Sequence, residues 1–260
     1  MKLTLLTPTG ERPQALNLCA RWIAEQTIIK NAKDFEYPAS IEWIVIDDGR
    51  LQTNIGVPAG VEIRHIRSIP AWEPGQNTQV RNLKAGLLTV DADLIAFIED
   101  DDCYLPHYLE NAIRAFMADP KLLVWGERPT TYYNVKHRKF RRLDNQRYAI
   151  LAATVIRREA IPVFLSSLDY ANKKGIDSNF WYRVREGELR NKSLLQRCGY
   201  DGYKAGVVGI KGMPGRPGIG TGFHEADKSK YWHKDPESKK LTKFVGPERA
   251  AIYAEFYEPS

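Results

Sequence analysis

The stretch from Leu94 to Pro106 reads LIAFIEDDDCYLP, a short apolar run followed directly by four acids. The run Leu94–Ile98 is too short for a core helix and is dominated by strand-favouring residues, so we expect a strand buried on both faces. Strands of this kind belong to parallel sheets packed between helices. Ligands bind such sheets at the carboxyl ends of the strands, which is where Glu99–Asp102 fall.

Four adjacent carboxylates repel one another unless a cation lies among them. Oxygen ligands suit Mg²⁺ or Mn²⁺, and Mg²⁺ in proteins commonly links one or two carboxylates to substrate phosphates. The cluster therefore predicts a divalent metal site that holds a phosphorylated ligand. The alternative is a solvated acidic turn before a helix that begins near Pro106, because acids favour helix N-termini. The position directly after a buried strand favours the metal site.

Strand and helix patterns alternate from Met1 to about Asp119, which predicts a parallel sheet with helices on both sides. The expected strands are Lys2–Thr7, Ile41–Ile46, Val61–Ile66 and Leu94–Glu99, and the expected helices are Ala15–Gln26, Val80–Val90 and Tyr108–Met117. Neither common glycine-rich phosphate loop occurs. Phosphate must then be held in another way, which agrees with a metal.

The second half of the chain is less regular. We expect strands at Leu122–Gly126, Tyr148–Arg157 and Lys204–Lys211, helices at Arg158–Leu168, Ser178–Arg185 and Pro247–Phe256, and a glycine- and proline-rich loop at Gly212–Gly222. The predicted organisation is a first half at residues 1–120, a second half of the same domain at 121–225, and a basic C-terminal extension at 226–260.

The charge balance allows an anionic partner, since the net charge is +6. Basic residues gather at Lys136–Arg147, where six Lys or Arg accompany one Asp, and again at Lys228–Lys243. No stretch approaches the roughly 18–20 apolar residues of a membrane span. The three cysteines have neither zinc spacing nor a disulfide pattern, so we expect a cytoplasmic protein with no transmembrane segment.

Taken together, four motifs resemble those of an inverting family 2 glycosyltransferase with the GT-A fold. They are Thr7-Pro8-Thr9 with Arg12 after the first strand, Asp47-Asp48-Gly49 after the second, Arg81-Asn82 before the metal strand, and Glu99-Asp100-Asp101-Asp102 with Pro106. The resemblance implies an α/β fold of GT-A type, in which a Rossmann-like, mostly parallel central sheet is flanked by helices, with a mixed acceptor-side half and a C-terminal loop and helix extension.

The resemblance also implies roles, with residues 1–120 as the nucleotide-sugar-binding half and residues 121–225 as the acceptor-binding and catalytic-base half. A nucleoside diphosphate sugar, UDP-linked, would be bound by Thr7, Pro8, Thr9, Arg12, Asp48, Arg81, Glu99 and Asp100, with Asp48 accepting from a uracil-type N–H. Asp101 would hold Mn²⁺ or Mg²⁺, joined by His224, which is otherwise a structural histidine. Lys211 and Arg216 are placed to meet phosphate. Glu99 stands where the family usually has Asp, which leaves its contact with the donor or the metal open.

Asp177 lies in GIDSNFW (175–181), which resembles the segment that supplies the family's catalytic base. Inversion requires a carboxylate that accepts the proton of the attacking hydroxyl. The alternative role for Asp177 is to cap a helix.

The acceptor side is predicted from Trp181 and from the basic residues Lys136, Arg138 and Arg141. The expected acceptor is a glycan, a lipid or a cell-surface precursor. DNA with hydroxymethylated bases is the alternative, because clustered Lys and Arg bind phosphate backbones and aromatic side chains stack on bases. The basic run is otherwise a solvated strand pair or a site for an anionic glycan. Two other classes remain: a nucleotidyltransferase, against which the loop PTGERP argues, and a non-catalytic protein that binds sugar nucleotides or nucleic acid.

Overall fold

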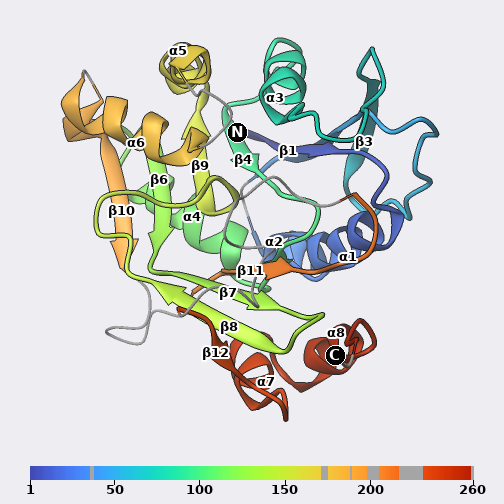
Figure 1. Ribbon diagram of the computed structural model, residues 1–260. Coiled ribbons are helices and arrows are strands. Elements are labelled where there is room, and N and C mark those ends of the chain that lie inside the picture. Colours follow the sequence, from blue (N-terminus) through green and yellow to red (C-terminus); the bar gives the residue numbers. More distant parts are fainter. Residues whose placement is uncertain (36–37, 171–174, 188, 198–204, 217–230, 259–260) are drawn as a thin grey trace.

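β1 (Lys2–Thr9) and β4 (Leu94–Phe97) form the centre of a seven-stranded sheet. The computed structural model describes residues 1–35, 38–170, 175–187, 189–197, 205–216 and 231–258 (Figure 1). The strand order is β10-β6-β9-β4-β1-β2-β3. The pairs β4–β1, β1–β2 and β2–β3 are parallel, whereas β9 runs antiparallel to both β4 and β6. This is the mixed, mostly parallel α/β sheet that the sequence predicts.

The remaining strands of this sheet are β2 (Ser40–Asp47), β3 (Glu62–Arg67), β6 (Val124–Arg128), β9 (Thr154–Arg157) and β10 (Ser193–Arg197). The helices are α1 (Pro13–Ala24), α2 (Thr27–Lys30), α3 (Gln79–Leu87), α4 (Tyr108–Ala118), α5 (Ile161–Tyr170), α6 (Ile176–Glu186), α7 (Lys239–Val245) and α8 (Pro247–Ala254). Short 3₁₀ turns occur at η1 (Ala32–Asp34), η2 (Leu151–Ala153), η3 (Arg158–Ala160) and η4 (Arg190–Lys192).

Helices cover both faces of the sheet because its central strands are apolar on both sides. In Figure 1, α3 and α5 lie above the sheet and α1 and α2 lie below it. α3 packs closely because it carries Gly86, where an added Cβ would lie only 2.6 Å from Leu6 and 2.7 Å from Ile46. On the same side, Phe97 of β4 stacks on Phe164 of α5 with ring centroids 4.4 Å apart.

A second sheet of five strands has the order β12-β8-β7-β11-β5. It contains β5 (Cys103–Tyr104), β7 (Thr130–Asn134), β8 (Lys139–Leu143), β11 (Val207–Lys211) and β12 (His233–Lys234). β5 directly follows the four acids, and β11 pairs with it. The second sheet therefore brings residues from the last third of the chain to the acid cluster.

Most of the expected elements are present, and one expected strand is shorter. Tyr148–Arg157 was predicted to be a single strand, but β9 begins only at Thr154 because the chain first makes the 3₁₀ turn η2. The Thr154 hydroxyl donates to the Ile150 carbonyl at 2.8 Å and closes that turn. The helix expected at Arg158–Leu168 likewise begins at Ile161, after η3.

The C-terminal helices pack onto the body of the fold. Tyr253 of α8 is buried, and its hydroxyl accepts a hydrogen bond of 2.9 Å from the Trp22 indole of α1. Arg249 forms an ion pair with Glu25 at 2.5 Å. No helix in the described ranges is both long and apolar enough to cross a bilayer.

Candidate active site

The carboxyl ends of β1, β2 and β4 meet at one edge of the large sheet because these three strands run parallel side by side. Thr9 ends β1, Asp47 ends β2, and Asp48 follows at once. Glu99–Asp102 follow β4, whose pairing is extended by a hydrogen bond from the Ile98 amide to the Leu6 carbonyl at 2.9 Å. The predicted donor-side residues are thus brought together by the topology of the sheet.

Asp100 is a buried anchor within the acid cluster. Its Oδ2 accepts a hydrogen bond of 2.6 Å from the Thr9 hydroxyl, and its Oδ1 accepts one of 2.8 Å from Arg12 Nη1. The same Arg12 nitrogen lies 3.3 Å from Asp101 Oδ2. Thr9 and Arg12 therefore contact the acid cluster directly. Thr7, further down β1, is fully buried and accepts a hydrogen bond from the Trp43 indole, while Pro8 is half-buried.

Asp102 is held by the second sheet. The Ile210 amide donates to its Oδ1 at 3.0 Å, and Lys211 Nζ lies 3.2 Å from the same oxygen. Lys211 Nζ is also 3.5 Å from Asp101 Oδ2. Burial raises the pKa of Asp102, against the opposing positive charge of Lys211. The sequence places Lys211 near phosphate, and the structure places it on the carboxylates themselves.

The cluster fits a divalent cation. Glu99, Asp101 and Asp102 each offer a carboxylate oxygen, and these atoms lie within 4.8 Å of one another. Asp102 Oδ2 is buried and has no hydrogen-bond partner among the described residues. Burial raises the pKa of Glu99 to about 7, although Lys211 opposes the shift. Such a set of hard oxygen donors suits Mg²⁺ or Mn²⁺. His224, the other predicted ligand, lies outside the described residues.

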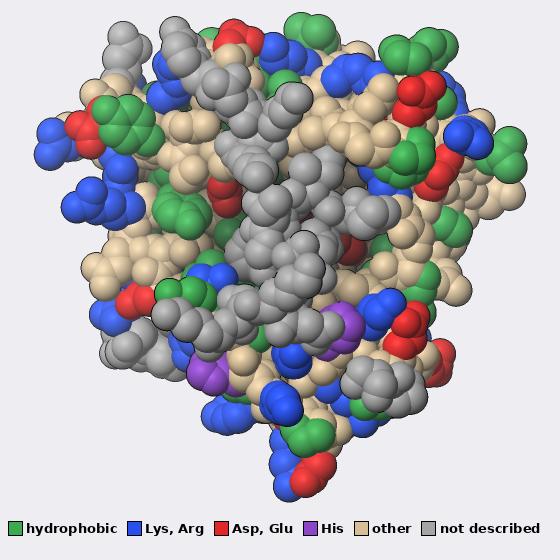
Figure 2. All heavy atoms as spheres, viewed as in Figure 1, with side chains coloured by type: hydrophobic (Ala, Val, Ile, Leu, Met, Phe, Trp, Pro, Cys, Tyr) green, Lys and Arg blue, Asp and Glu red, His purple; other side chains and the backbone are tan. Residues whose placement is uncertain are grey.

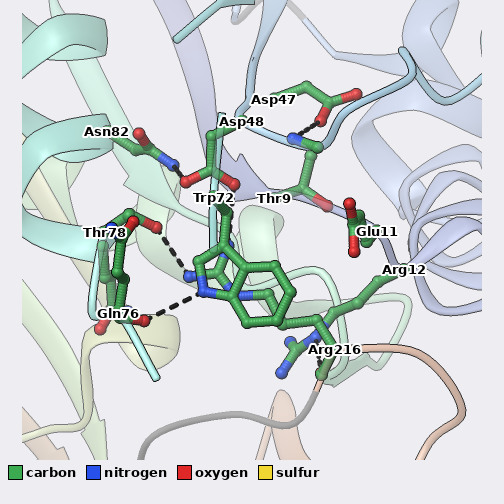
Figure 3. A network of polar contacts seen from close by, with 12 residues as sticks. Thr9, Glu11, Arg12, Asp47, Asp48, Trp72, Gln76, Thr78, Asn82 and Arg216 are labelled. Atoms are coloured by element: carbon green, nitrogen blue, oxygen red, sulfur yellow. Dashed lines mark hydrogen bonds and ion pairs between the residues drawn. The ribbon is translucent and has the colours of Figure 1, made fainter. Parts of the chain in front are cut away.

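Asp48 is the centre of a second polar network, shown in Figure 3. It is fully buried. Its Oδ1 accepts from Arg216 Nη1 at 2.8 Å, and its Oδ2 accepts from Asn82 Nδ2 at 2.9 Å and Arg81 Nη2 at 3.3 Å. Gly10 makes the close approach possible, because a Cβ there would lie 2.1 Å from Asp48 Oδ1.

Two residues of this network were not predicted. Trp72 donates its own amide hydrogen to the Asp48 carbonyl at 2.7 Å, and its ring lies against Arg216, with 4.6 Å between the guanidinium carbon and the ring centroid. The Thr78 hydroxyl accepts from Arg216 Nη2 at 2.7 Å. The presence of a tryptophan in the polar loop before α3 could have indicated that this loop forms part of the site.

Asp177 lies in the first turn of α6, which begins after Gly175 in a left-handed conformation with φ of 76°. Its Oδ1 accepts from the Ser178 amide at 2.8 Å, so it does not cap the helix across a turn. The side chain is partly exposed, and burial raises its pKa. Its negative charge contributes to raising the pKa of Glu99, Tyr132 and Tyr148. Asp177 is therefore close enough to interact electrostatically with Glu99 of the acid cluster.

The predicted acceptor residues are separated. Trp181 is 1% exposed and donates to the Thr154 hydroxyl at 3.2 Å, so it supports α6 from within the core. Lys136 forms an ion pair with Glu258 at 2.6 Å, and Arg138 lies over the Tyr257 ring at 3.8 Å. Arg141 lies over Tyr231 at 5.1 Å. These three basic residues lie in the β7–β8 hairpin and contact residues of the C-terminal extension.

A cavity of about 630 Å³ opens beside the acid cluster. One wall is the loop Gly212–Arg216, another is Glu255–Glu258, and Arg12, Gln14, Asp101 and Lys136 complete the lining. Below it, Figure 2 shows Lys and Arg side chains gathered over the part of the face where β8, β12 and α7 lie. The pairing of β12 with β8 brings the first basic cluster of the sequence and the described part of the second, residues 231–243, onto this one surface.

Comparison with known proteins identifies the family. Residues 7–185 match the family described as Glycosyl transferase family 2. The chain belongs to glycosyl transferase family 2. No curated protein matches the sequence.

Solved structures with a similar fold include S. aureus TarS 1-349, with a TM-score of 0.50 and 16% identity over 81% of this chain and 60% of that chain. The structure of S. aureus TarS 1-349 in complex with UDP-GlcNAc has a TM-score of 0.51 and 16% identity, and covers 84% of this chain and 60% of that chain. This family 2 chain thus spans 60% of the TarS chains that it matches, with which it shares the fold.

Proposed function

We propose that this family 2 chain transfers a sugar from a nucleoside diphosphate sugar to an acceptor hydroxyl, with inversion at the anomeric carbon. The observation that carries the proposal is the Glu99–Asp101–Asp102 cluster, with its oxygen atoms within 4.8 Å of one another, at the carboxyl end of β4. Asp48 and Asp177 are each connected to this cluster, one through a chain of hydrogen bonds and the other through its charge.

The connection to Asp48 runs through two arginines. Arg216 binds Asp48, Arg12 Nε donates to the Arg216 carbonyl at 2.7 Å, and Arg12 Nη1 binds Asp100. A donor can therefore place its nucleoside near Asp48 and its diphosphate near the acids. The TarS structure that shares this fold contains UDP-GlcNAc, which supports a UDP-linked donor, with Thr9, Arg81 and Lys211 in the donor set.

The metal would be held by Asp101 and Asp102, with Glu99 beside them. When bound, a divalent cation there offsets the negative charge that develops on the departing diphosphate. Arg12 and Lys211 contribute positive charge to the same region. Since both already contact the carboxylates, the protein compensates part of the cluster's charge before any ligand binds.

Asp177 acts as the base in this proposal. The acceptor oxygen bonds to the anomeric carbon, the bond from that carbon to the diphosphate oxygen breaks, and its electron pair leaves with the nucleoside diphosphate. The acceptor proton passes to Asp177. Burial raises the pKa of this carboxyl, which makes its carboxylate a stronger proton acceptor than that of an exposed aspartate.

The acceptor is proposed to be anionic. The two basic clusters lie on one surface, and the exposed residues that contribute to it include Arg142, Lys234, Lys239, Lys240 and Lys243. A phosphate-bearing glycan and DNA with hydroxymethylated bases both offer a hydroxyl next to negative charge. Parallel transfer assays with each polymer separate them, because only the acceptor gains the sugar, and added salt should weaken the binding of either polyanion.

The test of the reaction is the product released from UDP- and GDP-sugars in the presence of Mn²⁺. Glycosyl transfer releases the nucleoside diphosphate, whereas transfer of the nucleotidyl group from the same donor releases the sugar 1-phosphate. We expect Asp177→Asn to lower release by about 10²- to 10⁴-fold and to leave the Mn²⁺-dependent thermal shift by UDP unchanged. Glu186→Gln, at the exposed end of the same helix, is the matched control. Release by Asp177→Asn at the parent rate would remove the assigned base, and sugar 1-phosphate as product would overturn the proposed reaction.

A further inference from the structure

The guanidinium of Arg216 fills the space over Asp48 at the carboxyl end of β2 (Figure 3). One of its terminal nitrogens donates to Asp48 Oδ1 at 2.8 Å and the other donates to the Thr78 hydroxyl at 2.7 Å. Trp72 lies against the guanidinium, whose carbon is 4.6 Å from the ring centroid. The planar guanidinium of Arg216 therefore donates a hydrogen bond to the buried carboxylate of Asp48 while it stacks on the indole of Trp72.

The platform under this group is fixed. The Trp72 amide donates to the Asp48 carbonyl at 2.7 Å, and the Trp72 indole nitrogen donates to the Gln76 carbonyl at 3.1 Å. The ring is 8% exposed. A nucleobase has the same requirements as the guanidinium, because it is planar, stacks on aromatic rings and presents polar edges.

The backbone holds Arg216 in this position. The Arg216 amide donates to the Glu11 carbonyl at 3.2 Å, and Arg12 Nε donates to the Arg216 carbonyl at 2.7 Å. Gly215 adopts φ of 102°, and a Cβ there would lie 2.5 Å from the Glu11 carbonyl oxygen. The placement of Arg216 thus depends on a residue without a side chain and on two main-chain contacts.

We propose that Arg216 occupies the nucleobase position of the donor site and that the bound base displaces it, stacking on Trp72 and donating a ring N–H to Asp48. This inference rests on the proposed function. Uracil and guanine carry such a ring N–H, whereas adenine and cytosine do not. The displaced side chain has room, because the loop Gly212–Arg216 also lines the 630 Å³ cavity beside Asp101.

The consequence is that Arg216 weakens nucleotide binding. The apparent affinity of a ligand falls by the fraction of protein in the competent state. If Arg216 occupies the position about nine-tenths of the time, its removal tightens binding by about tenfold. Removing Trp72 weakens binding whether or not Arg216 is present, because the base loses its stacking partner.

The experiment is calorimetric titration of UDP and GDP, with and without Mn²⁺, into the full chain and its variants. We expect Arg216→Ala to bind the preferred nucleotide at least about fivefold more tightly. Arg50→Ala is the matched control, since it removes the same charge from an exposed loop nearby. Thr78→Val is the second variant, because it removes one anchor of Arg216 and leaves Asp48 intact, and it is expected to tighten binding as well.

Unchanged or weaker binding by Arg216→Ala, when the parent chain binds nucleotide, overturns the inference and makes Arg216 a donor ligand. Should Arg216→Ala not fold, Thr78→Val decides by the same criterion. If neither the parent nor the variants bind any nucleotide, both the inference and the proposed function fail, whereas the first outcome leaves the proposed function standing.

Discussion

Gly126 of β6 supports the helix that carries Asp177, and alanine there should damage both stability and transfer. A Cβ at this position would lie 2.5 Å from the Ala149 Cβ and 2.6 Å from Trp181 Cζ2, where ordinary contacts begin at 3.4 Å. Trp181 would have to recede by about 0.8 Å. Its ring is held by the hydrogen bond to Thr154 and by the edge contact with Phe180, so the strain cannot be relieved by rotating one side chain.

Overpacking a core costs about 1–3 kcal/mol, and the lower backbone entropy of unfolded alanine returns up to about 1 kcal/mol. A net loss of about 1–2 kcal/mol corresponds to a decrease in Tm of about 2–8 °C for a chain of this size. Trp181 lies one turn beyond Asp177 on α6, so the base moves with it. A misplacement of about 1 Å can cost on the order of 100-fold in rate, and we expect transfer to fall by about 10- to 100-fold.

Calorimetry gives Tm, titration gives the donor Kd, and initial rates of nucleoside diphosphate release give transfer. The donor Kd should not change, because β6 lies outside the donor edge of the sheet. Gly56→Ala is the control, since its Cβ would meet nothing within 4 Å. Parent-like Tm and rate for Gly126→Ala would refute the view that tight packing under Trp181 positions the base.

Three further predictions concern the metal, the base and the C-terminal helices. Asp101→Asn should abolish the Mn²⁺-dependent thermal shift by UDP, and a persistent shift would remove Asp101 from the metal site. Because burial raises the pKa of Asp177, kcat/KM should fall as pH decreases through a value above the ordinary aspartate pKa of about 3.9; a decline only at or below that value would contradict the role. Tyr253→Phe leaves the buried Trp22 indole N–H without its acceptor and should cost about 1–3 kcal/mol in unfolding free energy with little change in rate. Equal stability of Tyr253→Phe and the parent would show that the C-terminal helices add little to the fold.

The first half of the fold was predictable because its central strands are buried on both faces. Ile41–Ile46 and Leu94–Ile98 are apolar runs that end in acids, and local patterns identify them. β7 and β8 were missed for opposite reasons. β7 (TTYYN) is completely buried but polar in composition, and β8 (KFRRL) is so basic that it reads as a solvated segment. The stems of its Lys and Arg residues can cover apolar surface while their charged ends stay in water.

The donor side of the site was predictable as a set of positions but not as a set of contacts. Parallel strand ends were expected to bring Thr9, Asp48 and the acids together, and the register of β1 with β2 and β4 does so. The contacts of Arg216 and Lys211 depend on the chain returning some 110–170 residues later, and no local pattern encodes that return. The sequence suggests that Lys211 and Arg216 lie near phosphate, but in the folded chain they pair with the carboxylates of Asp102 and Asp48.

The four acids are adjacent in sequence, but cationic side chains from distant parts of the chain give them different environments. Arg12 and the Thr9 hydroxyl saturate Asp100, so its loss should unfold the edge of the sheet more than it affects metal binding. Lys211 and the Ile210 amide hold one oxygen of Asp102 and leave the other buried without a partner among the described residues. Arg12 and Lys211 together offset two of the four formal negative charges, and one divalent cation would neutralise the remaining −2. Asp101 contacts both Arg12, which follows β1 of the large sheet, and Lys211, which ends β11 of the second sheet. A change in metal occupancy at Asp101 is therefore expected to affect both sheets.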